Sequence, residues 1–213
     1  MHFDHTQMLA MLVAASFAAG LNVYATVATL GLLAHAGVFP LPANLHLLGN
    51  WWIIAAALGM FLIEFVGDKI PAFDLIWNAL HTFIRVPVAA LIAYHASSQL
   101  SPSAQMLSAL LGGSVALLAH GSKTAVRAAV TPSPEPVSNI ALSMGEDATA
   151  IGLTWFAARH PIWAAAITVV LLVAAILLIR VLWRAMKRFF VRAQESWRSL
   201  SPAPQPIANQ NHP

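Results

Sequence analysis

Six runs of apolar residues, separated by short polar or proline-containing breaks, account for most of the chain. They cover residues 8–36, 51–67, 73–96, 104–130, 137–158 and 162–182. A helix needs roughly 20 apolar residues to cross a bilayer, and these runs do not alternate as the strands of a membrane barrel do. The pattern therefore predicts an all-α membrane protein with about six transmembrane helices.

Proline marks most of the breaks between these helices. Residues 131–136, reading Thr-Pro-Ser-Pro-Glu-Pro, form the clearest loop, and Pro161 suits the first turn of the last helix. Beyond residue 200 the chain is rich in Pro, Asn and Gln, a composition typical of disorder. We predict a transmembrane helical bundle over 1–183, a basic cytoplasmic helix over 184–199 and a disordered tail over 200–213.

Composition supports the membrane assignment. Hydrophobic residues make up 59% of the chain, charged residues make up 9%, and the mean hydropathy is +0.71. A soluble domain has about 25% charged residues, so this chain lacks the charge to coat a water-soluble globule. It also has no cysteine, which excludes disulfides and thiolate chemistry.

The basic residues are distributed unevenly. Six of the eleven lie at or beyond the end of the last apolar run, namely Arg180, Arg184, Lys187, Arg188, Arg192 and Arg198. Because basic residues favour the cytoplasmic side, we expect a cytoplasmic C-terminus and, with six crossings, a cytoplasmic N-terminus. The partners expected for Arg180–Arg198 are anionic lipid headgroups, and nothing around the cluster indicates binding to nucleic acid.

Polar side chains recur at helical spacing within the apolar segments. In the third segment, spacings of four, three and four residues place a set on one helix face: Asp74, Asn78, His81 and Arg85. The other segments contribute Asn22 (first), Glu64 and Asp68 (second), Lys123 and Arg127 (fourth), and Glu146 and Asp147 (fifth). Lipid cannot solvate such groups, so these faces should turn toward one another. They form either a functional site or a purely structural set of buried ion pairs.

Two charge clusters are predicted from the depth of each residue in its segment. Arg85 lies near the middle of the third segment, where an arginine costs roughly 2.5–3.5 kcal/mol, and Glu146 or Asp147 is its expected partner. Nearer the inner face, Lys123 and Arg127 are expected to pair with Glu64 and Asp68.

Roles follow from these clusters. The residues predicted to bind a substrate or ion are Asn22, His81, Arg85, Glu146 and Asp147. Those predicted to form a gate or salt-bridge cluster are Glu64, Asp68, Lys69, Asp74, Lys123 and Arg127. The histidines lack the close spacing of a tight metal site, so we predict neither a metal nor a cofactor.

A weak internal duplication is also visible. The string Ala18–Asn22 resembles Ala119–Lys123, and Glu64–Asp68 parallels Ser143–Asp147. Two copies of three helices would lie in opposite orientations, an architecture typical of transporters and channels. Gly20 and Gly121 each precede a polar residue in their strings, Asn22 and Lys123, and both are expected to permit local unwinding of the helix.

No catalytic signature of a known enzyme class is present. The expected function is that of a small transporter or channel for an ion or small polar solute, and transport coupled to protons is one form of it. We also expect the protein to oligomerise, because a chain of this length encloses a pathway poorly alone. The alternative is a non-transporting membrane scaffold or assembly factor that acts through the basic C-terminal helix. A membrane-embedded enzyme acting on lipid is a third hypothesis.

Three extended strings resemble one family. They are EFVGDKIPAFDLIWNALHTFIRVP (Glu64–Pro87), GGSVALLAHGSKTAVRAAVTPSPEPVSN (Gly112–Asn139) and SMGEDA (Ser143–Ala148). The chain is similar over residues 8 to 180 to the bacterial membrane family known as domain of unknown function 4126. This resemblance implies a multi-helix protein of the bacterial inner membrane, and it supplies no functional residue.

Overall fold

The computed structural model describes residues 4–38, 41–130 and 136–200, without the side chains of 43, 71–75, 136, 193 and 196–200. The helices are α1 (His5–Leu21), α2 (Val23–His35), η1 (Ala43–Gly49), α3 (Trp51–Gly67), α4 (Pro71–Ala96), α5 (Pro102–Val130), α6 (Pro136–Arg159) and α7 (Pro161–Leu200). No strand occurs in the described ranges, so the all-α prediction is confirmed. The chain divides into two compact units, unit 1 over 1–179 and unit 2 over 180–213.

Several helices are suited to a membrane. Three are long and apolar enough to cross one, over Ile76–Ala96, Pro102–Val130 and Pro161–Arg192, and α1, α2 and α3 are shorter apolar helices. Proline occupies the first position of α4, α5, α6 and α7, where its missing N–H costs nothing. The predicted second to sixth segments therefore match α3 to α7 closely, and the apolar helices support a membrane protein.

The first apolar segment is not one helix. It breaks at Asn22, whose backbone is extended (φ −149°, ψ 102°), into α1 of 17 residues and α2 of 13 residues. The side-chain oxygen of Asn22 accepts a hydrogen bond of 2.9 Å from the backbone N–H of Ala25. The backbone N–H of Asn22 donates to the carbonyl of Ala18. One residue therefore ends α1 and caps α2.

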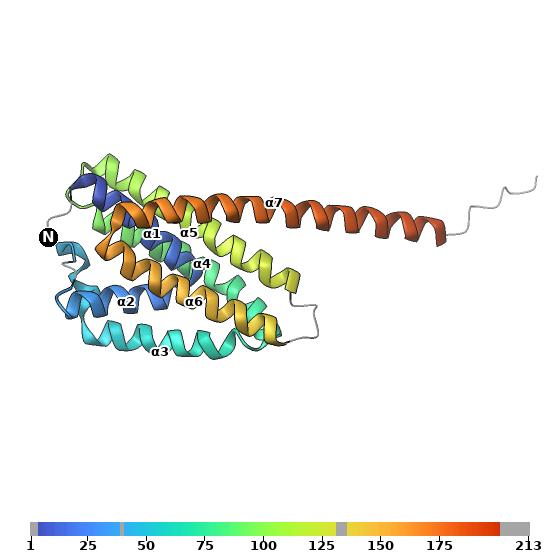
Figure 1. The fold of residues 1–213 in the computed structure, drawn as a ribbon, viewed down its shortest axis with the longest axis horizontal. Helices are drawn as coiled ribbons and strands as arrows, with labels where there is room; N and C mark the ends of the chain where they lie inside the picture. Colours follow the sequence, from blue (N-terminus) through green and yellow to red (C-terminus); the bar gives the residue numbers. More distant parts are fainter. Residues whose placement is uncertain (1–3, 39–40, 131–135, 201–213) are drawn as a thin grey trace, which may run out of the picture. The chain divides into compact units, whose positions relative to one another are not determined.

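Helices α1 and α2 form a hairpin that returns to the end where it began (Figure 1). Met11 of α1 and Leu33 of α2 share a core cluster with Ala158 and Ala164, which lie at the end of α6 and the start of α7. We call this end of unit 1 the hairpin end. The turn at Asn22 lies halfway along the bundle, where its side chain meets α6.

Five helices run the length of unit 1 in alternating directions: α3, α4, α5, α6 and the first part of α7 (Figure 1). The six predicted crossings are not confirmed, because the hairpin of the first segment enters and leaves unit 1 at one end (Figure 1). Helix α1 begins at the end of unit 1 opposite the one at which α3 ends (Figure 1). The predicted repeat is not confirmed either, since α5 continues unbroken through Gly121 whereas α1 breaks at Asn22.

Small residues allow the hairpin to enter the bundle. A Cβ at Gly20 would lie 2.4 Å from the carbonyl oxygen of Ala116 and 2.8 Å from the Cβ of Ala119. One at Gly112 would lie 2.6 Å from the Cβ of Ala93. Close helix approach through small residues is common in membrane bundles. These small residues bring α1 and α4 close to α5.

Candidate functional site

A network of charged side chains lies buried beyond the hairpin turn. Its bases are Arg85 on α4 and Lys123 and Arg127 on α5, each at most 2% exposed. Its acids include Glu64 on α3 and Asp68, which caps α3, at 0% and 1% exposure. Charges buried to this degree persist only when they are paired.

Lys123 is the centre of the network. Its Nζ lies 3.3 Å from Oε1 of Glu64, 3.2 Å from Oδ2 of Asp68 and 3.3 Å from Oε2 of Glu146. It also donates at 3.3 Å to the carbonyl of Leu21, the last residue of α1. A cation favours the negative end of a helix dipole. Lys123 therefore joins three carboxylates to the turn of the hairpin.

Arg127 extends the network toward α6. Its Nη2 lies 2.7 Å from Oε2 of Glu146 and 3.1 Å from Oδ2 of Asp68. Its Nη1 donates at 3.1 Å to the backbone carbonyl of Asp68. The predicted pairing of Lys123 and Arg127 with Glu64 and Asp68 is seen in three of its contacts, and Glu146 joins the same group.

Arg85 has a different partner from the one predicted. It forms an ion pair with Glu64, and its Nη1 lies 3.2 Å from Oδ1 of Asn78 and 3.0 Å from Nδ1 of His120. The predicted pairing with Glu146 or Asp147 is therefore wrong.

The hairpin turn explains this error, because it lies between α4 and α6. Asn22 bonds to Asp147 on α6, while the Tyr24 hydroxyl lies 2.9 Å from Nε2 of His81 on α4. Glu146 and Asp147 are neighbours on one helix, so they point in directions about 100° apart. Glu146 faces α5 and Asp147 faces the hairpin turn.

Asp147 is the carboxylate in the least usual surroundings. It is 4% exposed, and its Oδ1 accepts a hydrogen bond of 2.9 Å from Nδ2 of Asn22. Its Oδ2 is buried with no hydrogen-bond partner in the described part of the chain. Asn22 and Asp147, both predicted to bind a substrate or ion, thus meet at the N-terminus of α2, where a negative charge is favoured.

Three carboxylate oxygens of the site are buried without a hydrogen-bond partner among the described residues. They are Oε2 of Glu64, Oδ1 of Asp68 and Oδ2 of Asp147. Counting only the described side chains, three bases face four acids, namely Arg85, Lys123 and Arg127 against Glu64, Asp68, Glu146 and Asp147. This set has a net charge of −1 when all are ionised.

His81 lies beside the network rather than within it. Its ring packs on Trp77 with centroids 4.2 Å apart, and its Nδ1 lies 2.8 Å from the Trp77 carbonyl oxygen. The neighbouring His120 does reach the network, because it contacts Arg85 and lies 2.8 Å from Oγ1 of Thr82. His81 therefore holds the hairpin to α4 through Tyr24.

Two residues predicted for the gate cluster are not seen in it. Lys69 donates at 2.5 Å to the carbonyl of Phe65 and lies 3.1 Å from the centroid of its ring, a cation–π contact within the end of α3. Among the described side chains, these contacts hold the ammonium of Lys69 at its own helix. The side chain of Asp74 lies outside the described residues.

Four contributors to the site are not among the predicted site residues: Tyr24, Asn78, Thr82 and His120. Helical spacing places Asn78 on the polar face of Arg85 and His120 one turn before Lys123, but the sequence pattern gave neither residue a role in the site. Tyr24 and Thr82 carried no comparable signal, since a single hydroxyl in an apolar helix usually serves local packing or its own backbone.

A cleft of about 640 Å³ reaches the network from the side, beyond the hairpin turn. It lies between α1, α5, α6 and α7, and Glu146 is on its wall with a side chain 12% exposed. The other acids of the network are at most 4% exposed. Glu146 is therefore the member of the network that a molecule entering this cleft would meet.

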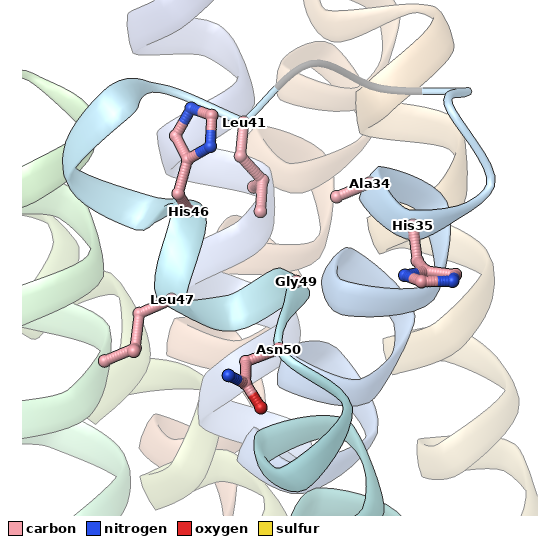
Figure 2. A pocket seen from close by; sticks show the side chains of 7 residues that line it. All are labelled: Ala34, His35, Leu41, His46, Leu47, Gly49 and Asn50. Atoms are coloured by element: carbon pink, nitrogen blue, oxygen red, sulfur yellow. The ribbon is translucent and has the colours of Figure 1, made fainter.

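A second cavity, of about 780 Å³, lies at the hairpin end and contains none of the predicted site residues. Figure 2 shows its walls, where His46 comes from η1 and His35 from α2, and the two rings do not point toward each other. His35 instead packs on Trp51 with centroids 4.4 Å apart. Within the described residues, no group of three or more His, Asp or Glu side chains is placed to hold a metal.

The fold and the site define an all-helical membrane protein with a buried charge network beneath a helical hairpin. The chain belongs to the family described as domain of unknown function 4126 (DUF4126), whose model matches residues 9–181. The family predicted from the three motifs is thereby confirmed. Searches of curated proteins and of solved structures gave no significant match.

Proposed function

We propose that the protein is a small inner-membrane transporter or channel for protons or small cations. The observation that carries this proposal is the carboxylate of Asp147. It is buried at the hairpin turn, bonded to the neutral Asn22, and left with one oxygen unpartnered among the described residues. Intramembrane carboxylates with such surroundings are typical of proton and ion pathways.

The hairpin supports the same function. A helix break at membrane depth is tolerated where it is buried in protein or lines a cavity, and broken helices in transporters direct their ends at the transported ion. Here the carbonyl end of α1 meets Lys123, and the N-terminus of α2 lies beside Asp147. The network then provides the path between this site and Glu146 at the cleft.

The proposed topology has five membrane crossings and one re-entrant hairpin. Basic residues after Ile179 favour a cytoplasmic C-terminus, which places the opposite end of unit 1, and with it Lys69, in or near the cytoplasm. The hairpin end then faces outward. Because ~200 residues enclose a pathway poorly alone, the protein is expected to form homo-oligomers.

Labelling of single cysteines tests this topology. The chain has no cysteine, and Thr6 at the start of α1 is exposed. We expect Thr6→Cys to react with a membrane-impermeant maleimide added to intact spheroplasts. Ile70→Cys, which is exposed at the other end, should react only after the membrane is permeabilised. Protection of Thr6→Cys in intact cells would instead support six crossings.

Replacing Asp147 with asparagine tests the proposed function. The amide cannot take up and release a proton in the physiological range, so proton flux should fall to the level of empty vesicles. Flux is measured in proteoliposomes with an enclosed pH-sensitive dye and an imposed potential. Glu146→Gln is expected to reduce flux as well, because it removes the acid at the cleft.

The matched control for these variants is Glu195→Gln, an exposed acid in unit 2. It should leave flux unchanged. Normal flux in both Asp147→Asn and Glu146→Gln would remove the two carboxylates from the mechanism and reject proton transport by this network.

A scaffold function through the basic helix is the second candidate, favoured by unit 2 itself. Arg184, Lys187, Arg188 and Arg192 line one groove there, while Phe189 is 70% exposed. This combination suits anionic lipid headgroups or a partner protein. Deleting residues 184–213 separates the two functions, since a transporter should keep its flux and a scaffold should lose its role.

A further inference from the structure

The cleft beyond the hairpin turn has walls suited to a ligand with an apolar chain. They are mostly apolar or small, with Phe17, Leu142, Gly145, Leu171, Ala174 and Leu178 among them. Among the described lining residues, Glu146 alone is charged. With a volume of about 640 Å³, the cleft falls within the ~300–1,000 Å³ range of small-molecule sites.

The cleft exists because the hairpin stops halfway. Beyond Leu21 no residue of α1 or α2 fills the space between α6 and α7, and both facing surfaces carry small residues. A Cβ added at Gly145 would meet no described atom within 4 Å. The gap is therefore a property of the backbone arrangement, not of one side-chain rotamer.

Three side chains on the cleft wall, those of Ser122, Thr149 and Glu146, present hydrogen-bond acceptors. The hydroxyl of Ser122 donates to the carbonyl of Ala119 at 2.7 Å, and that of Thr149 donates to the carbonyl of Gly145 at 2.6 Å. Their remaining capacity is to accept, as is that of the ionised carboxylate of Glu146. A complementary head group must therefore donate hydrogen bonds, and a positive charge on it would match Glu146.

We propose that this cleft binds an amphiphile with an ammonium head group, whose N–H groups donate to Glu146 and whose apolar chain lies along α6 and α7. An anionic head would face the Glu146 carboxylate, because Arg127 and Lys123 are fully buried behind it and bonded to acids. A neutral alcohol would lack the charge with which an ammonium group can bind the exposed edge of this carboxylate, beside the contacts that it already makes with Arg127 and Lys123.

Photolabelling of the purified full-length protein in detergent tests the site. One probe is a dodecylammonium whose alkyl chain carries a diazirine, and the other is the dodecanol with the same diazirine-bearing chain. The labelled residues are mapped by mass spectrometry. The ammonium probe should label the cleft helices near Gly145 and Ala174 at least about tenfold more strongly than the alcohol, a preference of about 1.4 kcal/mol. Labelling measures occupancy without flux, so the site can stand even if proton transport fails.

Three variants make the test specific. Glu146→Gln should abolish the preference for the ammonium probe, and Gly145→Phe should block both probes by filling the cleft. Gly59→Phe on α3 is the matched control, because a Cβ there also meets no described atom within 4 Å but lies outside the cleft. It should leave labelling unchanged. Equal labelling by both probes in every form, or labels that lie elsewhere, would overturn the proposal.

Competition identifies the source of the ammonium group. Reconstitution with phosphatidylethanolamine should suppress labelling relative to phosphatidylglycerol if a membrane lipid occupies the cleft. If the natural occupant is a free lipophilic amine, a soluble alkylamine should compete and the two lipids should give equal labelling. Failure of the alkylamine and of phosphatidylethanolamine to compete would count against any ammonium ligand.

Discussion

Replacing Arg85 with methionine is expected to lower the free energy of unfolding by about 3–5 kcal/mol, the usual cost of removing one partner of a buried ion pair. The guanidinium is fully buried and pairs with Glu64, which is itself 0% exposed. Its loss would also remove a partner from Asn78 and His120. Unfolding is measured by titrating the purified protein from a mild detergent into a denaturing one.

A double-mutant cycle identifies the partner of Arg85. Combining Arg85→Met with Glu64→Gln should give a coupling energy of about 2 kcal/mol, because the two side chains are in contact. Combining Arg85→Met with Asp147→Asn should be additive within about 0.5 kcal/mol, because Asp147 bonds to Asn22 instead. The reverse result would restore the pairing predicted from depth along the sequence and contradict the structure.

Much of the fold could be predicted because proline and the lengths of the apolar runs mark the same boundaries. Pro71, Pro102 and Pro161 each stand at the start of a helix in the structure, as a residue with fixed φ and no N–H should. The ends of α3 through α6 follow within a few residues of the apolar runs. Local rules were sufficient here because each of these helices is continuous.

The hairpin could not be predicted in the same way. Residues 8–36 form one apolar run, and the break within it depends on a single polar residue, Asn22. A helix break this deep in the bundle is tolerated because α5 and α6 supply hydrogen-bond partners. Lys123 donates to the carbonyl of Leu21, and Asp147 accepts a hydrogen bond from the side-chain amide of Asn22. These contacts join residues 102 and 125 positions apart, so no local pattern encodes them.

The members of the charge network were more predictable than its pairs. Helical spacing correctly brought Lys123 and Arg127 to one face, and their depth along the segment correctly set them against Glu64 and Asp68. The partner of Arg85 depended on relative depth, and that estimate assumed a first helix that crosses the bundle. With the hairpin turn between α4 and α6, Arg85 is separated from Asp147 and turns to Glu64.

Adding a side chain at Gly20 is the second change expected to have a large effect. A Cβ there would lie 2.4 Å from the backbone oxygen of Ala116 and 2.8 Å from its Cα, and backbone atoms cannot rotate away. We expect Gly20→Leu to lower the free energy of unfolding by about 3 kcal/mol, the upper range for overpacking a core. The same detergent titration measures it.

Gly121 provides the matched control, because it occupies the corresponding place in the similar sequence string on α5. A Cβ there meets no described atom within 4 Å, so Gly121→Leu should keep or slightly raise stability through better helix propensity.

The substitution at Gly20 should also disturb the candidate site, since displacing α1 from α5 moves the Leu21 carbonyl away from Lys123. Gly20→Leu should therefore lose proton flux even where it remains folded, while Gly121→Leu retains it. Equal stability and equal flux in the two variants would mean that the hairpin does not pack against α5 as the structure has it.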